Sequence, residues 1–452
     1  MLYRILLFLS LIAAVVVGAP TAHASATTDI TITRGDGTTT PGTIHAPESA
    51  SGRPGVVLVY GSGTSPSIKY AEQAEAFARA GIVALRYDKR TEHYTAAHRD
   101  YSLLADDALS AVAALRNRPE VDPNNVGIWG LSEGGWVAPL AASRSADIAF
   151  LITIGANSGA PAPQQTWADQ TKLRVGGVRG SMVDTLLPNG IRQVVGAGQF
   201  AEADYDQPSV LARIQQPVLG IWGDKDRLTP PGDSLRGFQA AFDQVGKTNY
   251  TLRTVRDTQH SGFTTTTGFD RGDHLSPEYT QLMGDWVNGL PGSAGRQVDQ
   301  PAAQRHSVTP LQPLAWWEST AVFLTVLAGT LLALAGFTLT GFVKSWRLPS
   351  PGPTRILVVT AVIGVVGTIA QIMSIASSRG TSFGPLIFGR TLPWLTLQVL
   401  AVCAVVALAL VVARSRHTLA EATTGARLRW ALLICGGTGF VLWALYFGLL
   451  LP

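Results

Sequence analysis

The stretch "VGIWGLSEGGW" (126–136) places one serine, Ser132, in a glycine-rich turn directly after an apolar run. Gly130 and Gly134 flank this serine two positions away on each side, which is the G-x-S-x-G pattern. In that pattern the serine stands on a strained turn between a strand and a helix, where side chains at the flanking positions would collide with it. The stretch therefore predicts Ser132 as a nucleophile, and the competing interpretation is an ordinary strand-to-helix turn.

Around this turn the chain alternates short β-rich runs with longer amphipathic stretches. We expect strands at 29–33, 42–45, 56–60, 82–87, 126–129, 150–154, 218–222 and 251–255, and helices over 70–80, 103–117 and 231–245. Strands that alternate with helices indicate βαβ units and a mostly parallel sheet, in which the first two strands are close enough to pair antiparallel. From Val56 onward the strands are nearly all apolar, as strands covered by helices on both faces are. The fold class is therefore α/β.

One long interval interrupts this alternation. Residues 157–216 contain no expected strand, and a stretch of that length is usually a functional insertion. Because it emerges beyond the C-terminal edge of the sheet, we interpret it as a helical cap within an α/β domain over 25–300. Residues 291–313 are rich in Pro, Gly, Gln and Ser, which is typical of a flexible linker, and we place the linker to the membrane region at 301–318.

Candidate partners for Ser132 follow two later strands. Ligands bind at the carboxyl ends of the strands in an open parallel sheet. "GDKDRLTP" (223–230) offers Asp224 and Asp226 after one strand, and "DTQHSGF" (257–263) offers His260 after the next. We prefer Asp226 as the acid because Asp224 is better suited to capping the turn. His260 is preferred as the base over His274, and the order Ser, Asp, His is that of one triad class.

An oxyanion needs two backbone donors. The helix after Ser132 offers the N–H of Glu133, and "VLVYGSGT" (57–64) offers the N–H of Ser62 in a loop where glycines allow close approach. A plain flexible turn is the alternative for this second loop. The chain has no P-loop, no H-E-x-x-H and no dinucleotide-binding glycine pattern, so we expect neither a cofactor nor a metal.

The C-terminal third is a membrane region by composition. Four apolar segments, at 319–343, 355–376, 392–413 and 430–451, are each long enough to cross a bilayer. The loops at 344–355 and 414–429 hold seven basic residues and the loop at 377–391 holds two, so the positive-inside rule places the first and third loops in the cytoplasm. Residues 25–318 are then extracytoplasmic, in a multi-pass protein of the cell membrane.

The first 24 residues agree with that orientation. They contain Arg4, an apolar run and Ala22-His23-Ala24, which is the form of a cleavable secretory signal. An uncleaved N-terminal anchor is the alternative. The net charge of +4 and the pI near 9.1 follow from the basic cytoplasmic loops, so we expect no nucleic-acid partner. Both cysteines, Cys403 and Cys435, lie in expected membrane helices, so the exported domain is expected to have no disulfide.

Three motifs carry a family resemblance: "YGSG" (60–63), "RYDKRT" (86–91) and "GLSEGG" (130–135). With them, residues 25–290 resemble the α/β-hydrolase superfamily, and look most like the bacterial serine esterase and peptidase-like branch with "HGSG", "RYDKRG" and "G-x-S-E-G-G" motifs. Tyr60 stands where that branch has His, and Thr91 where it has Gly, so the entrance of the pocket is expected to differ.

The resemblance implies acyl transfer to water through an acyl-enzyme at Ser132. His260 would act as general base and then acid, Asp226 would orient it, and the N–H groups of Glu133 and Ser62 would hold the oxyanion. Carboxylic esters are the expected substrates. A serine peptidase or an acyltransferase would use the same residues, and a non-catalytic sensor or scaffold is a hypothesis of a different class.

The role of the membrane region stays open between two interpretations. In the first it is an anchor and a surface for homo-oligomers, and in the second it presents lipid or lipid-linked acyl substrates to the cap. No ionisable residue lies deep in any of the segments, which argues against ion transport. Gln371 and Gln398 are the polar candidates for helix–helix contact.

Overall fold

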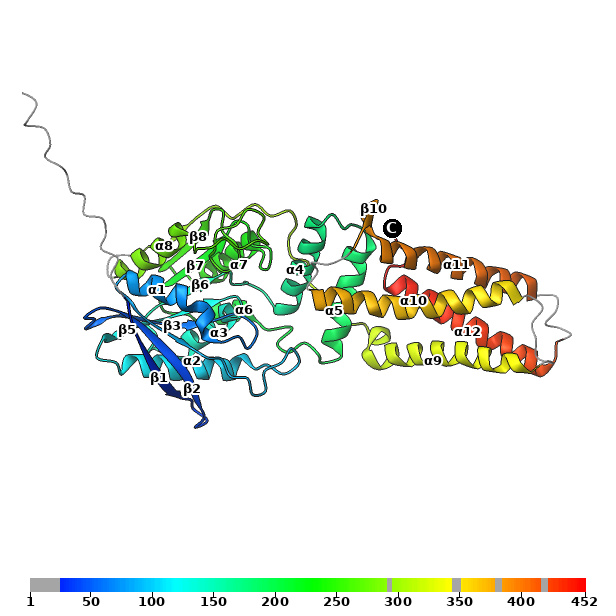
Figure 1. Ribbon diagram of the computed structural model, residues 1–452, viewed down its shortest axis with the longest axis horizontal. Coiled ribbons are helices and arrows are strands. Elements are labelled where there is room, and N and C mark those ends of the chain that lie inside the picture. The colour runs from blue at the N-terminus through cyan, green and yellow to red at the C-terminus, as the bar shows by residue number, and fades with distance from the viewer. Residues whose placement is uncertain (1–24, 291–294, 344–350, 379–383, 416–421) are drawn as a thin grey trace, which may run out of the picture.

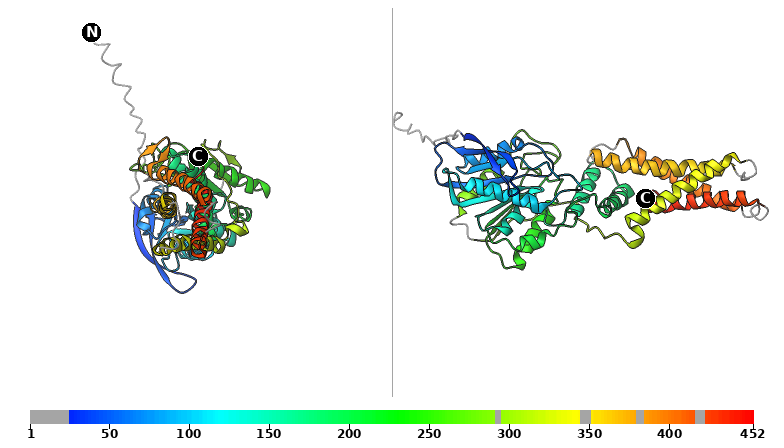
Figure 2. Two further views of the ribbon diagram at one scale, coloured as in Figure 1. Left: turned by 90° about the vertical axis from the view of Figure 1, so that its right-hand side faces the viewer. Right: turned by 90° about the horizontal axis from the view of Figure 1, so that it is seen from below.

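The computed structural model describes residues 25–290, 295–343, 351–378, 384–415 and 422–452. Three parts follow one another along its long axis: a sheet domain (25–300 apart from the cap), a helical cap, and a bundle of long helices at the C-terminus (Figure 1). The right-hand view of Figure 2 shows the same order of the three parts from below. The cap therefore lies between the sheet and the bundle.

The sheet has nine strands in the order β1-β2-β4-β3-β5-β6-β7-β8-β9. Their bounds are β1 Ser25–Thr33, β2 Thr39–Pro47, β3 Arg53–Val59, β4 Val83–Tyr87, β5 Val121–Leu131, β6 Leu151–Ile154, β7 Val218–Gly223, β8 Tyr250–Val255 and β9 Gln297–Val298. The β1–β2 and β2–β4 pairs are antiparallel and the other pairs are parallel. The eight expected strands and the mostly parallel sheet are confirmed. Strand β9 was not expected, because it lies in the segment predicted as a linker.

Alternate strand residues point to opposite faces of this sheet. Val56 and Leu58 of β3 pack with helices α1 (Ala71–Arg79) and α8 (Pro277–Asn288). Val57 and Val59 pack on the other face, with α2 (Tyr101–Arg116), α3 (Gly134–Arg144) and α7 (Pro231–Gln244). Burial on both faces explains why the central strands are apolar throughout.

The cap is helical, as expected. It consists of α4 (Pro161–Val175), the π-helical turn η2 (Met182–Leu186) and α5 (Leu187–Gly196). Helix α6 (Gln207–Leu211) falls inside the interval predicted as cap, but its Val210 and Leu211 belong to the core of the sheet domain. The interval is therefore part cap and part sheet domain.

The bundle contains α9 (Thr320–Leu339), α10 (Pro351–Ser378), α11 (Leu392–Ser415) and α12 (Thr424–Tyr446). These four helices are long and apolar enough to cross a membrane. Helix α12 begins six residues before the expected span, so Arg427 and Arg429 lie in its first turns and not in a loop. Residues 1–24, 344–350 and 416–421, on which the predicted signal segment and parts of both basic loops fall, lie outside the described residues.

Cap and bundle share one hydrophobic core. Leu186 and Leu187 of the cap are buried together with Trp394 and Leu397 of α11. Polar contacts reinforce this packing, because the N–H of Ser181 donates to the Pro452 carbonyl (2.9 Å). The cap is therefore built onto the end of the bundle.

Two polar side chains join the same parts of the chain. Arg192 of α5 donates to both carboxylate oxygens of Glu318, at 2.7 and 2.6 Å. Gln398, predicted for helix–helix contact, donates instead to the Leu451 carbonyl (2.7 Å) and to the Ser181 hydroxyl (3.3 Å) of the cap. Both contacts hold the cap against the bundle.

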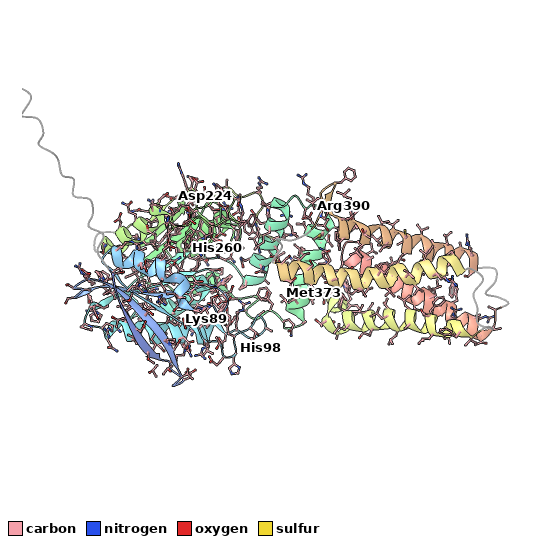
Figure 3. All side chains as sticks on the ribbon, viewed as in Figure 1. Lys89, His98, Asp224, His260, Met373 and Arg390 are labelled. Carbon is pink, nitrogen blue, oxygen red and sulfur yellow. The ribbon has the colours of Figure 1, made fainter. Side chains whose placement is uncertain are left out.

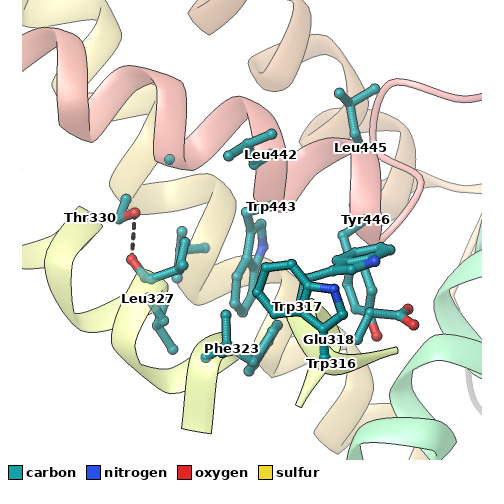
Figure 4. A pocket seen from close by; sticks show the side chains of 14 residues that line it. Trp316, Trp317, Glu318, Phe323, Leu327, Thr330, Leu442, Trp443, Leu445 and Tyr446 are labelled. Carbon is teal, nitrogen blue, oxygen red and sulfur yellow. Dashed lines mark hydrogen bonds between the residues drawn. The ribbon is translucent and has the colours of Figure 1, made fainter. Parts of the chain in front are cut away.

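Aromatic side chains line a cavity of about 530 Å³ at the cap end of α9 and α12 (Figure 4). Trp316 and Trp317 stand at its mouth with their rings exposed, and Phe323 and Trp443 stack inside it. Exposed indole rings at the end of an apolar helix are typical of the boundary between a bilayer and water. The cap end of the bundle is thus where one surface of a membrane would lie.

Candidate active site

Ser132 stands in the turn that joins β5 to α3. Its φ of +57° is rare for a residue other than glycine, and such a conformation typically costs about 1–3 kcal/mol. The N–H of Ser132 continues the sheet by donating to the Ile154 carbonyl of β6 (3.1 Å). The side chain is half-buried at the C-terminal edge of the sheet. A strained, partly open serine at this edge is the geometry that the pattern predicts for a nucleophile.

The flanking glycines are required by the backbone. A Cβ on Gly130 would lie 2.1 Å from the Gly134 carbonyl oxygen, and a Cβ on Gly134 would lie 2.1 Å from that of Val59. The sequence predicts a collision with the serine itself, whereas the structure places the collision between strand and helix backbones. The neighbour of the Ser132 side chain is Gly61, whose added Cβ would be 3.2 Å from the serine Cβ.

Asp226 and His260 are brought together at the ends of β7 and β8. The His260 Nδ1 lies 2.8 Å from Oδ2 of Asp226, which is completely buried. Because an ionised carboxylate only accepts hydrogen bonds, Nδ1 is the donor and Nε2 is left as an acceptor. The other oxygen, Oδ1, accepts from the N–H groups of Leu228 and Thr229, at 2.8 and 2.9 Å.

The competing residues lie elsewhere. Asp224 accepts a long bond from the Thr258 N–H of another loop (3.4 Å), and the N–H groups of its own turn donate to Asp226, so the turn-capping role expected for Asp224 falls to Asp226. His274 is exposed on a loop. The geometry therefore pairs His260 with Asp226 and leaves both alternatives outside the pair.

Gly155 lies between His260 and the residue of β6 that binds Ser132. It follows the Ile154 carbonyl that binds Ser132, and its own φ is +54°. A Cβ at this position would lie 2.7 Å from Nδ1 of His260, so only glycine leaves room for the imidazole. No hydrogen bond of the Ser132 hydroxyl is recorded with any described residue, and such bonds often form only when a substrate is bound.

The two expected oxyanion donors are both available. Within the described residues, neither the Glu133 N–H nor the Ser62 N–H has a recorded acceptor. The N–H of Gly63, in contrast, donates to the Tyr94 hydroxyl (3.0 Å). Glu133 precedes the first residue of α3, where the helix dipole favours negative charge.

A buried charge cluster lies directly behind the elbow. The Glu133 side chain is 1% exposed and accepts from Lys89 Nζ (2.6 Å), Arg99 Nη1 (2.7 Å) and the Tyr94 hydroxyl (2.7 Å). Burial by itself raises the pKa of this carboxyl, but Lys89 and Arg99 outweigh it and the net shift is downward. Burial lowers the pKa of Lys89, against the pull of Glu133. The carboxylate is therefore held ionised by its neighbours.

Lys89 also fixes the loop that precedes the expected donor Ser62. Its Nζ donates to the carbonyls of Gly61 (2.6 Å) and Tyr60 (3.4 Å). One ammonium group thus joins the loop at 60–63 to the elbow. The sequence predicts only the backbone role of Glu133, and the joint presence of "RYDKRT" and "GLSEGG" is the signal from which this pair could be found.

Figure 3 shows where these groups lie. His260 and Lys89 are both in the half of the sheet domain nearer to the cap. Tyr60, which departs from the family pattern, stacks on Tyr70 with ring centroids 4.2 Å apart, and Thr91 is exposed. Within the described residues, no group of three or more His, Cys, Asp or Glu side chains is placed to hold a metal ion.

The strand order decides the fold. An antiparallel β1–β2 pair, the crossover β4-β3-β5 and a serine elbow after β5 occur together in one architecture. The chain has the α/β-hydrolase fold. Ser132, Asp226 and His260 follow β5, β7 and β8, in the chain order Ser, Asp, His that is known for this fold.

Comparisons with known proteins show what parts of the chain are similar to. No family model matches the chain. It is 31% identical over 129 residues to the polyketide transferase claH of Penicillium crustosum, covering 26% of this chain and 41% of that protein. It is 30% identical over 105 residues to the thiohydrolase aneE of Aspergillus aculeatus, covering 22% and 33%. The chain thus spans well under half the length of these relatives.

Two solved structures show a partial likeness to the chain. One is a dienelactone hydrolase from Anabaena variabilis, with 19% identity and a TM-score of 0.37, covering 59% of this chain and 98% of that one. Another is a hyperthermophilic esterase from Pyrobaculum calidifontis, with 13% identity and a TM-score of 0.40, covering 60% and 86%.

Proposed function

We propose that this protein is a serine hydrolase that cleaves carboxylic esters. The observation that carries the proposal is the 2.8 Å contact between a buried Asp226 and His260, next to a strained Ser132 on the same edge of the sheet. A turn that served only to reverse the chain would need neither the strain nor the pair. A sensor or scaffold on this fold would not require all three residues either.

The proposed reaction runs in two halves. The Ser132 Oγ attacks the ester carbonyl carbon while His260 Nε2 takes its proton, and Asp226 stabilises the imidazolium that forms. The N–H groups of Glu133 and Ser62 hold the oxyanion, each worth about 3 kcal/mol of transition-state stabilisation. The imidazolium then protonates the departing alkoxide, which leaves an acyl-serine. Water, deprotonated by His260, releases the acid and restores the serine.

We further propose that the bundle tethers this activity to the cell membrane with the sheet domain outside. The four apolar helices support membrane insertion. The basic residues of the first and third loops in the sequence support the orientation. Proteolysis of intact cells tests it, since a fully protected sheet domain would contradict an extracytoplasmic location.

Thioester cleavage is a second candidate, because two relatives at 30% and 28% identity are thiohydrolases. A peptidase or acyltransferase would share the acyl-enzyme, and the wall of the pocket decides among them. A screen of esters, thioesters and peptides with the intact protein in detergent ranks these substrates by kcat/KM.

The test of the nucleophile is covalent labelling. A fluorophosphonate probe should label the purified protein, and Ser132→Ala should abolish the label. Labelling that survives this substitution would contradict the assignment. His260→Ala should reduce the hydrolysis of p-nitrophenyl esters far more than its control His274→Ala, since only His260 contacts Asp226. The reverse ranking would show that the base is misassigned.

A further inference from the structure

A cavity of about 330 Å³ lies where the cap, the bundle and the sheet domain meet. Leu187 and Ile191 of α5 line it on the cap side, and Ile372 and Met373 of α10 line it on the bundle side. Its remaining lining includes polar groups, among them Arg99 of the sheet domain. The cavity therefore has an apolar wall from α5 and α10, and its polar end is formed by Arg99 of the sheet domain and by Gln165 and Asp169 of cap helix α4.

The polar end touches the loops of the proposed catalytic residues. Arg99 donates to Glu133, the residue after Ser132, and its guanidinium lies 5.7 Å from the ring centre of Phe200, another lining residue. Gln165 of α4 also lines the cavity. The preceding residue of α4, Gln164, donates to the carbonyl of Leu228.

Leu228 belongs to the loop of the catalytic acid, since its N–H donates to Asp226. The cavity is thus joined directly to the loop of the nucleophile through Arg99, and Gln165 in its lining is one residue from the contact with the loop of the acid.

The apolar end reaches a candidate membrane span. Helix α10 is one of the four helices that are long and apolar enough to cross a bilayer, and Met373 marks the place where it reaches the cap (Figure 3). The Met373 side chain is 57% exposed, and Val194, which lines the cavity from α5, is 38% exposed. Exposed apolar side chains at the end of a candidate membrane span are suited to contact with lipid chains.

We infer that this cavity is the acyl-chain site of the enzyme, and that it takes a long-chain carboxylic ester from the bilayer. The inference rests on the proposed function and adds the substrate class to it. The acyl chain would lie against Ile372 and Met373 of α10 and against Leu187 and Ile191 of the cap. The polar end would receive the ester on its way to Ser132. A water-soluble short ester would leave the apolar wall unused.

Gly190 provides a clean way to fill the cavity. It lines the cavity on α5, and an added Cβ would meet only Ile372 Cδ1, at 4.0 Å. Gly190→Leu therefore puts a side chain into open space without removing a contact, and leucine is the better helix former. Gly329 of α9, with nothing within 4 Å of an added Cβ and an exposed position, gives the matched control Gly329→Leu.

The measurement is the ratio of kcat/KM for p-nitrophenyl palmitate to that for p-nitrophenyl butyrate, with the full chain in mixed micelles. Gly190→Leu should lower this ratio by about tenfold or more, because each methylene kept out of an apolar site costs roughly fourfold. Met373→Trp should lower it as well. Gly329→Leu should leave the ratio at the wild-type value. An unchanged ratio in both cavity variants would overturn the inference.

Binding without turnover separates this inference from the proposed function. A palmitate analogue that carries a photoreactive diazirine, applied to Ser132→Ala, should label peptides from residues 186–200 and 372–376. Gly190→Leu in the same background should remove that label, and Gly329→Leu should retain it. Labelling confined to other segments would contradict the acyl site. If the wild type hydrolyses no ester but this labelling is observed, the proposed function alone is contradicted.

Discussion

Replacing Asp226 with asparagine should leave the fold intact and remove nearly all hydrolysis. In the native structure Oδ1 of Asp226 accepts from the N–H groups of Leu228 and Thr229, while Oδ2 faces Nδ1 of His260 at 2.8 Å. An asparagine must point its carbonyl oxygen at the two N–H donors, since the reverse orientation would set an NH₂ group against them. Its NH₂ group then faces His260.

The magnitude follows from the tautomer. Facing an NH₂ donor, Nδ1 of His260 has to accept, so the imidazole carries its proton on Nε2. This nitrogen is the one that should take the proton from Ser132, and in this tautomer it has no lone pair free to do so. A wrong tautomer of this kind lowers kcat by about 10⁴-fold, or roughly 5 kcal/mol of transition-state stabilisation. The two backbone hydrogen bonds survive, so the melting temperature should change little.

The assay is hydrolysis of p-nitrophenyl butyrate by the full chain in detergent, with melting temperature as the control for folding. Asp224→Asn is the matched variant, because Asp224 accepts only a 3.4 Å bond from Thr258 and should change kcat by less than about threefold. The reasoning would be refuted if Asp226→Asn kept a tenth of the wild-type kcat, or if Asp224→Asn were equally damaging.

Three further outcomes are expected. The pKa of His45 is lowered from 6.5 to about 4 by burial and by Arg86, so the unfolded chain binds more protons between these values. The free energy of unfolding should therefore fall by up to about 3 kcal/mol as the pH drops from 6.5 to 4, and His45→Gln should flatten this slope in thermal unfolding. Glu133→Gln leaves buried cations uncompensated, so chemical denaturation should show a loss of about 3–5 kcal/mol, and a loss under 1 kcal/mol would contradict the ionised cluster. Arg192→Gln breaks the bidentate contact with Glu318, so amide exchange in residues 187–196 should accelerate while exchange in the sheet stays unchanged.

The positions of the proposed catalytic residues were predictable because they depend on local order along the chain. In a parallel sheet the carboxyl ends of the strands share one edge, so Asp226 and His260 had to come near Ser132 once their strands were recognised. Eight strands were long enough to show a β-rich pattern of their own. Strand β9 was not, because it consists only of Gln297–Val298 and exists only by pairing with β8.

The side-chain cluster behind the elbow was not predictable in the same way. Whether Glu133 is solvated or buried depends on where Lys89 and Arg99 arrive, and both stand on the long connection after β4. Nothing in the spacing of the motifs specifies the path of that connection. The backbone role predicted for Glu133 and the observed buried role of its side chain are compatible, because the N–H and the carboxylate point to different partners.

The packing of the cap onto the bundle gives a reason for four helices where one would serve as a tether. A single helix would be enough to tether the sheet domain, but it could not form a packing surface for the cap. In the structure this packing surface consists of side chains from several helices. Leu186 of the cap is buried in one core with α11, and Ser181 donates hydrogen bonds to the carbonyls of Leu451 and Pro452. A cap anchored in this way cannot move as a unit relative to the bundle without breaking a shared hydrophobic core. Access to Ser132 is then expected past the cavity that borders α10, and not by opening of the whole cap.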